Sequence, residues 1–153
     1  MTRVLLGLGS NLGDRDANIA AALDRLTDER ALHVLATSRV RTTAPVGGPP
    51  QPDYRNAAAL AETDLRPRDL LAAMKRAEER VGRRPGGERW GAREVDVDLL
   101  LFGEEVIDEP DLVVPHPRMA QRRFVLEPAA EVAPQMRHPV LGRTVREMLE
   151  ALP

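Results

Sequence analysis

The chain has 153 residues, 42% hydrophobic and 30% charged, the size and composition of one globular domain, which we expect to cover residues 1–153. A formal net charge of −2 gives no general attraction to nucleic acid or anionic membranes, and the lack of cysteine excludes disulfides, thiol nucleophiles and thiolate metal sites. There is no signal-like N-terminus and no apolar run long enough to span a membrane, so we expect a cytoplasmic protein.

The first third of the chain predicts a strand, a helix and a second strand. The apolar run at 3–9 is typical of a buried strand. Asp14 can cap the following helix, whose apolar face carries Ile19, Leu23 and Leu26. Residues 32–43 alternate and include β-branched side chains, which favours a strand.

The next third holds one ambiguous run and one clear helix. Residues 44–52 form a long Pro/Gly loop, and loops of this length are usually functional or disordered. The alanine-rich run 56–63 would be helical by intrinsic propensity. The helix at 65–81 is the clearest, with Pro67 at its start and Gly82 after its end.

Two acids begin the strand predicted at 95–102. Asp96 and Asp98 share a face because side chains alternate along a strand, and Glu94 joins them if the strand begins earlier. Carboxylates without nearby His or Cys suit Mg²⁺. Residues 80–93 form a Gly/Pro-rich loop with five arginines and one acid. An arginine loop beside two acids suits a magnesium-bound polyphosphate better than the alternative, a solvated loop beside two surface acids.

After this strand we expect a small hairpin or irregular arm at 104–114. Short helical turns are predicted near 117–122 and 125–131, and a final helix at 144–152.

The same segment carries a family resemblance. The motif Arg89-Trp90-Gly91-x-Arg93-x-x-Asp96-x-Asp98, followed by an apolar run, resembles the signature of the 6-hydroxymethyl-7,8-dihydropterin pyrophosphokinase family of folate biosynthesis. The likeness extends from Gly9 to Phe124. It implies that an ATP-dependent enzyme transfers pyrophosphate to the pterin hydroxymethyl group and releases AMP.

The resemblance also implies that 56–63 is a strand. The order then becomes βαββαβ, an α+β ferredoxin-like fold with a four-stranded antiparallel sheet, two helices on one face and a C-terminal extension.

For the pterin, the resemblance implies a flat ring stacked between Tyr54 and Phe124. Asn56 would bind its amino-pyrimidinone edge, and Thr43 and Val46 would line the pocket. By themselves the aromatics favour core packing, and Asn56 could equally form an Asx-turn.

For the nucleotide, the resemblance implies that Asp96 and Asp98 hold Mg²⁺, with two ions expected. Arg83 and Arg93 would neutralise charge during transfer. Further contacts to ATP are expected from Lys75, Glu78, Arg89, Trp90, His116 and Arg122.

The chain departs from the family pattern at three places. Arg41 stands where an aromatic is common, Ala44 replaces a usual proline, and Arg84 precedes Pro85 where an arginine is expected one position later. The role of Arg84 is therefore open.

We interpret the chain as a monomeric enzyme whose partners are ATP and the pterin alcohol, without nucleic acid or membrane. The alternative is a non-catalytic ferredoxin-like module that binds a nucleotide or metal. A nucleic-acid-binding module would need stacked aromatics and a basic sheet face, which the sequence lacks.

Overall fold

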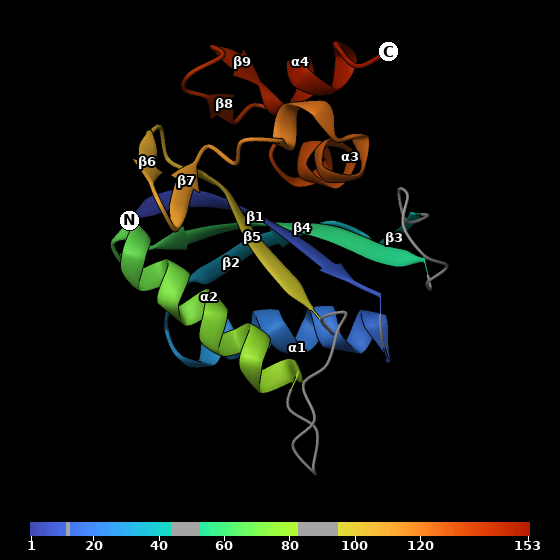
Figure 1. Cartoon of the computed structure of the whole chain (residues 1–153), viewed down its shortest axis with the longest axis vertical. Helices are drawn as coiled ribbons and strands as arrows, with labels where there is room; N and C mark the ends of the chain where they lie inside the picture. Colours follow the sequence, from blue (N-terminus) through green and yellow to red (C-terminus); the bar gives the residue numbers. More distant parts are fainter. Residues whose placement is uncertain (12, 44–52, 83–94) are drawn as a thin grey trace.

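The computed structural model describes residues 1–11, 13–43, 53–82 and 95–153. In these residues one antiparallel sheet lies between two pairs of helices (Figure 1). Its strand order is β2-β4-β1-β5, with β3 paired to β4. The strands of this sheet are β1 (Thr2–Ser10), β2 (His33–Thr37), β3 (Arg41–Thr43), β4 (Tyr54–Thr63) and β5 (Asp96–Phe102).

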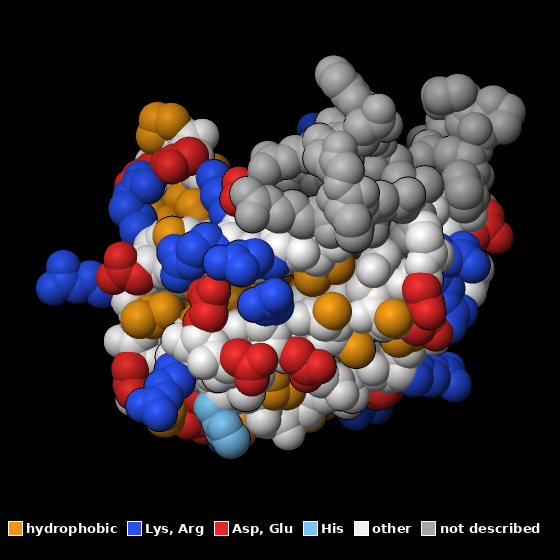
Figure 2. Space-filling model, turned by 90° about the horizontal axis from the view of Figure 1, so that it is seen from below, with side chains coloured by type: hydrophobic (Ala, Val, Ile, Leu, Met, Phe, Trp, Pro, Cys, Tyr) orange, Lys and Arg blue, Asp and Glu red, His pale blue; other side chains and the backbone are white. Residues whose placement is uncertain are grey.

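Helices α1 (Arg15–Asp28) and α2 (Pro67–Gly82) cover one face of the sheet. Asp14 caps α1, since its carboxylate accepts a 3.2 Å hydrogen bond from the Ala17 N–H. The apolar stripes of both helices pack on alternate residues of β1, including Leu6 and Leu8. The outer side of this layer carries acidic and basic side chains side by side (Figure 2), as expected for solvent-exposed helices.

Helices α3 (Arg123–Val132) and α4 (Val145–Glu150) lie on the opposite face, where Leu126 and Met148 pack against Leu5 and Leu101. Before α3 come a hairpin of β6 (Ile107–Glu109) and β7 (Leu112–Val114) and a short 3₁₀ helix (Met119–Gln121). A second hairpin, β8 (Arg137–His138) and β9 (Arg143–Thr144), joins α3 to α4. Among the described residues, no helix has the length and hydrophobicity needed to cross a membrane.

The ferredoxin-like α+β prediction is confirmed, including the strand assigned to the alanine-rich run. β4 lies between β2 and β1 and is buried on both faces. Ala57 and Ala59 contact the α1/α2 layer, whereas Ala58 packs with the α3/α4 layer. Small side chains suit a strand that helices approach from both sides, and this packing overrides the helical propensity of alanine.

Four details of the prediction were wrong. The strand expected over 32–43 is interrupted at 38–40 and forms both β2 and β3, so the described sheet has a fifth strand. The segment expected as a short turn near 125–131 belongs to α3, a helix of 10 residues. The β8–β9 hairpin was not predicted, because strands of two residues carry no periodic signal. The last helix, predicted over 144–152, spans six residues, with Thr144 as its cap.

Candidate active site

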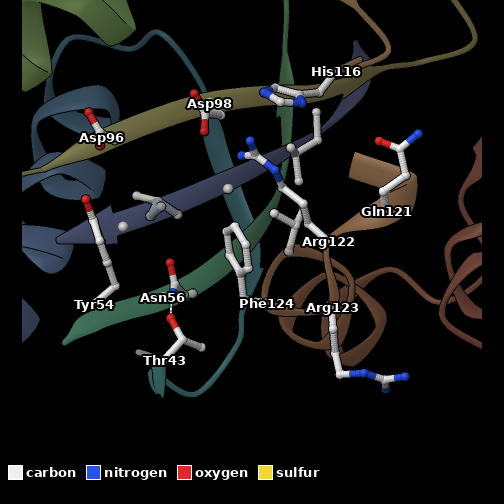
Figure 3. Close-up of a pocket in the computed structure, with 16 residues that line it drawn as sticks. Thr43, Tyr54, Asn56, Asp96, Asp98, His116, Gln121, Arg122, Arg123 and Phe124 are labelled. Carbon is white, nitrogen blue, oxygen red and sulfur yellow. Dashed lines mark hydrogen bonds between the residues drawn. The ribbon is translucent and has the colours of Figure 1, made fainter. Parts of the chain in front are cut away.

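A pocket of about 710 Å³ opens on the α3 face of the sheet, where α3 leaves the strand ends uncovered (Figure 3). It is lined from β1, β3, β4 and β5 and from the segment around the start of α3. The lining residues are Gly7, Leu8, Gly9, Thr43, Tyr54, Asn56, Ala57, Asp96, Asp98, Leu100, His116, Gln121, Arg122, Arg123, Phe124 and Val125. Eight of the predicted site residues, far apart in sequence, therefore meet around one pocket: Thr43, Tyr54, Asn56, Asp96, Asp98, His116, Arg122 and Phe124.

The floor of the pocket is β1, whose Gly7 and Gly9 leave it without side chains. A Cβ atom at Gly9 would lie 3.2 Å from Asn56 Oδ1, and one at Gly7 would lie 3.4 Å from Leu100 Cδ1. Gly9 pairs with Asn56 on one side and with Asp96 on the other. The bare strand therefore separates two walls of different chemistry, one from β4 and one from β5.

The β4 wall combines an amide with aromatic rings. Asn56 is buried, and its Nδ2 donates a 2.5 Å hydrogen bond to Thr43 Oγ1 on β3. Tyr54 and Phe124 are half-buried and line the pocket, so neither is a core packing residue. Because Asn56 lies within β4, the Asx-turn alternative does not apply. This wall offers a fixed amide and apolar ring surface to a flat, polar-edged ligand.

The β5 wall carries the two acids. Val97 between them is buried on the opposite face, so the prediction that Asp96 and Asp98 share a face is confirmed. Within the described part of the chain, no cluster of three or more His, Cys, Asp or Glu side chains could hold a metal ion. Mg²⁺ is commonly bound by one or two carboxylates, with water and substrate phosphates completing its shell. The two acids thus fit magnesium that arrives with a polyphosphate.

His116 lies near Asp98 as a neutral donor. Its Nδ1 accepts a 3.2 Å hydrogen bond from the Arg118 N–H, so the ring proton is on Nε2. Burial lowers the pKa of His116, Arg122 and Arg118 lower it further, and Asp98 opposes them. The backbone N–H of His116 donates to the Leu100 carbonyl at 2.9 Å and fixes the residue against β5.

Arg122 connects the two walls. Its guanidinium carbon lies 5.5 Å from the centroid of the Phe124 ring, a cation–π contact. Figure 3 shows the guanidinium extending from the start of α3 toward Asp98 and His116. A cation is thereby held between the aromatic wall and the acidic wall.

Two predicted nucleotide contacts lie elsewhere. Lys75 and Glu78 are on α2, on the other side of the sheet, and do not line the pocket. Lys75 is exposed, and Glu78 Oε2 accepts a 2.9 Å hydrogen bond from the Val97 N–H. The predicted residues Val46, Arg83, Arg89, Trp90 and Arg93 lie outside the described residues, as do Ala44, Arg84 and Glu94.

The predicted site residues omit four polar or glycine positions of the pocket: Gly7, Gly9, Gln121 and Arg123. The spacing of Gly7 and Gly9 was the available signal, since two glycines on one face of a buried strand indicate close approach to that face. Arg123 contributes only its stem, because its Nη2 donates to the Pro153 carbonyl at 3.2 Å and its guanidinium points away (Figure 3). No sequence signal singles out Gln121.

Comparison with known proteins agrees with this geometry. Residues 5–134 match the family described as 7,8-dihydro-6-hydroxymethylpterin-pyrophosphokinase. The 2-amino-4-hydroxy-6-hydroxymethyldihydropteridine pyrophosphokinase of Pseudomonas aeruginosa is 42% identical over 99% of this chain and 92% of its own. The protein of the same name from Methylorubrum extorquens is 40% identical over 99% of this chain and 94% of its own.

Solved structures show the same fold. The wild-type HPPK-DHPS of Plasmodium falciparum superposes with a TM-score of 0.75 at 15% identity, over 97% of this chain. The chain spans 44% of the length of that protein. Family match, relatives and fold together establish that the chain belongs to the 7,8-dihydro-6-hydroxymethylpterin-pyrophosphokinase family, whose enzymes transfer a pyrophosphoryl group to hydroxymethyldihydropterin in folate biosynthesis.

Proposed function

We propose that the pterin binds along the β4 wall and magnesium-bound ATP along the β5 wall, with the reacting groups meeting above the glycine floor. The observation that carries this proposal is the division of one pocket into an amide–aromatic wall and an acidic wall with an arginine between them. Each wall suits one of the two substrates, and β1 places the walls side by side.

The pterin half uses ring faces and one amide. Tyr54 and Phe124 would contact the faces of the flat ring, which orients it. Asn56 would bind the amino-pyrimidinone edge, because an amide presents donors and an acceptor together. Thr43 supports this role by holding the Asn56 amide in place. Val46 is proposed to line the same half.

The nucleotide half uses acids and cations. Asp96 and Asp98 would hold magnesium, with two ions proposed, and bound magnesium would neutralise charge on the phosphate oxygens. The Nε2–H of His116 and the guanidinium of Arg122 would donate to the same phosphates.

For the other residues expected to contact ATP, the proposal rests on the family resemblance alone. Arg83 and Arg93 would offset charge that develops during transfer. Lys75, Glu78, Arg89 and Trp90 would surround the nucleotide.

In the reaction, the pterin hydroxyl oxygen bonds to the β-phosphorus of ATP. The bond from that phosphorus to the oxygen shared with the α-phosphate breaks, AMP leaves with the electron pair, and the hydroxyl proton passes to solvent. The described pocket has no residue that stands out as a general base for this step. Positioning and electrostatics are sufficient for phosphoryl-type transfer.

The test is product analysis with each component left out in turn. We expect AMP and the pterin pyrophosphate to form only when ATP, Mg²⁺ and the pterin alcohol are all present. Formation of ADP would overturn attack at the β-phosphorus. Nucleotide binding without any turnover would favour the non-catalytic module.

A further inference from the structure

Two residues in the first turn of α1 form hydrogen bonds with the residues on either side of Tyr54. Arg15 Nη1 donates a 2.6 Å hydrogen bond to the Asp53 carbonyl just before it. Asp16 accepts two hydrogen bonds from Arg55 just after it, from Nε at 2.8 Å and from Nη2 at 3.0 Å. These contacts join residues 38 and 39 positions apart in sequence.

Arg55 lies on the opposite face of the sheet from the pocket. Its neighbours Tyr54 and Asn56 both line the pocket, and alternation along β4 sends the Arg55 side chain toward α1. The third guanidinium nitrogen, Nη1, donates to Thr42 Oγ1 on β3. Thr42 pairs with Arg55 in the sheet and precedes Thr43, which holds the Asn56 amide. One guanidinium therefore ties α1, β3 and β4 together.

We propose that Arg55, anchored by Asp16, is a positioning residue for the pterin half of the pocket. This inference rests on the proposed function of that half. Arg55 holds β3 in register against β4, and this register sets Thr43 Oγ1 and hence the direction of the Asn56 amide. Arg55 itself touches neither substrate.

Two features separate this role from a general contribution to stability. The Arg55 and Asp16 side chains are 26% and 55% exposed, and ion pairs that exposed stabilise a fold little. β3 has only three residues, so its backbone ladder alone defines its position weakly. The hydrogen bond from the Arg55 guanidinium to β3 therefore affects the local geometry of β3 more than the free energy of unfolding of the whole protein.

The same protein offers a matched control at the other end of β4. Arg68, in the first turn of α2, makes ion pairs with Glu109 and Asp111 on the β6–β7 hairpin, and these three side chains are 50%, 43% and 54% exposed. Arg68 follows the end of β4 at Thr63, whereas Arg55 lies at its start, and Arg68 does not line the pocket. Arg68→Ala removes a comparable arginine without touching the pterin half.

The experiment is calorimetry of 6-hydroxymethylpterin and, separately, of a magnesium-bound non-hydrolysable ATP analogue. Arg55→Ala is expected to raise the pterin Kd about two- to tenfold, the worth of one misaligned hydrogen bond. In Arg55→Ala, the Kd of the ATP analogue and the Tm of the protein should change no more than they do in Arg68→Ala. Asp16→Asn should reproduce the pterin defect, and the double variant should add little to it. Arg55→Lys should not restore binding, because its single nitrogen cannot reach both Asp16 and Thr42.

Asn56→Ala, measured in parallel, separates this inference from the site assignment. If Asn56→Ala weakens pterin binding and Arg55→Ala does not, the positioning role is overturned and the pterin site stands. The positioning role is also overturned if Arg68→Ala shows the same pterin defect, or if Arg55→Ala weakens both ligands equally. If Asn56→Ala leaves pterin binding unchanged, the pterin site itself is wrong, and the positioning role with it.

Discussion

The carboxylate of Glu78 accepts a 2.9 Å hydrogen bond from the backbone N–H of Val97, the residue between Asp96 and Asp98. Glu78 is on α2, on the far side of the sheet from the pocket. The helix layer thereby fixes the strand between the two carboxylates that we propose as magnesium ligands. Glu78, which we also propose at the nucleotide, thus supports the backbone beneath the acids.

This relationship predicts the behaviour of Glu78 variants. Glu78→Ala leaves the Val97 N–H without its acceptor, which should cost about 1–3 kcal/mol of unfolding free energy and raise the Mg²⁺ concentration needed for half-maximal activity. Denaturant unfolding and magnesium titrations measure the two effects. Glu78→Gln keeps an acceptor oxygen and should behave almost as the parent. If Gln is as damaging as Ala, the charge of Glu78 matters and a direct nucleotide contact becomes the better explanation.

Removing either pocket acid should stop turnover while leaving the fold intact. Asp96→Ala and Asp98→Ala should each lower kcat about a hundredfold or more, since a bound metal contributes several kcal/mol to the transition state. AMP release at saturating Mg²⁺ and circular dichroism are the measurements. Asp108→Ala, which removes an exposed acid of β6, is the control and should be neutral. Near-normal activity of either pocket variant would contradict the metal assignment.

Filling the pocket floor should impair the pterin half. In Gly9→Ala the new methyl lies 3.2 Å from Asn56 Oδ1, so the amide must shift, and we expect a pterin Kd about tenfold higher. Gly7→Ala places its methyl at 3.4 Å from Leu100, an ordinary contact, and should have a smaller effect. Gly82→Ala meets no atom of the described residues within 4 Å and serves as the control. Equal pterin affinities in all three variants would show that the floor does not control the site.

The buried His138 should make stability depend on pH. Burial lowers the pKa of His138, and its Nδ1 accepts N–H bonds from Val140 and Leu141 that a protonated ring would lose. The unfolded chain therefore binds the proton more readily. The contribution of His138 to the free energy of unfolding is therefore full above pH about 6.5, the usual histidine pKa, and it decreases as the pH falls below that pKa.

His138→Asn keeps an acceptor without the titration and should reduce this dependence, while the part caused by His116, whose pKa burial also lowers, should remain. Denaturant unfolding between about pH 5 and pH 8 measures it. His33 is exposed, so His33→Asn should leave the pH dependence as it is. If both variants retain the parent's slope, other groups cause it.

Local patterns were sufficient for the elements with strong periodicity. The α2 helix, the Asp14 cap and the shared face of Asp96 and Asp98 each follow from residues a few positions apart, and each is present. The strand at 56–63 needed the family resemblance, because alanine favours helix until packing from both sides favours a strand. The ion pair of Arg55 with Asp16 could not be predicted, since its partners are 39 residues apart and neither lies in a motif.

The same limit applies within the site. Tyr54, Asn56 and Phe124 were predicted only through the wider family resemblance, since a lone aromatic or asparagine has no local signature. Gly7 and Gly9 were visible as a pattern, but their meaning depends on β4 and β5 lying on either side of β1. Which residues line the pocket depends on which strands pair in the sheet, and a short stretch of sequence does not determine that pairing.

The bare surface of β1 has a consequence for the architecture as a whole. α3 and α4 cover only part of the second face of the sheet, and Gly7 and Gly9 provide no side chains for the remainder. A central strand without a covering layer is exposed to water on that side. The two substrates, if they bind over the glycines as proposed, would act as the missing portion of that layer, so substrate binding would also shield the central strand from water.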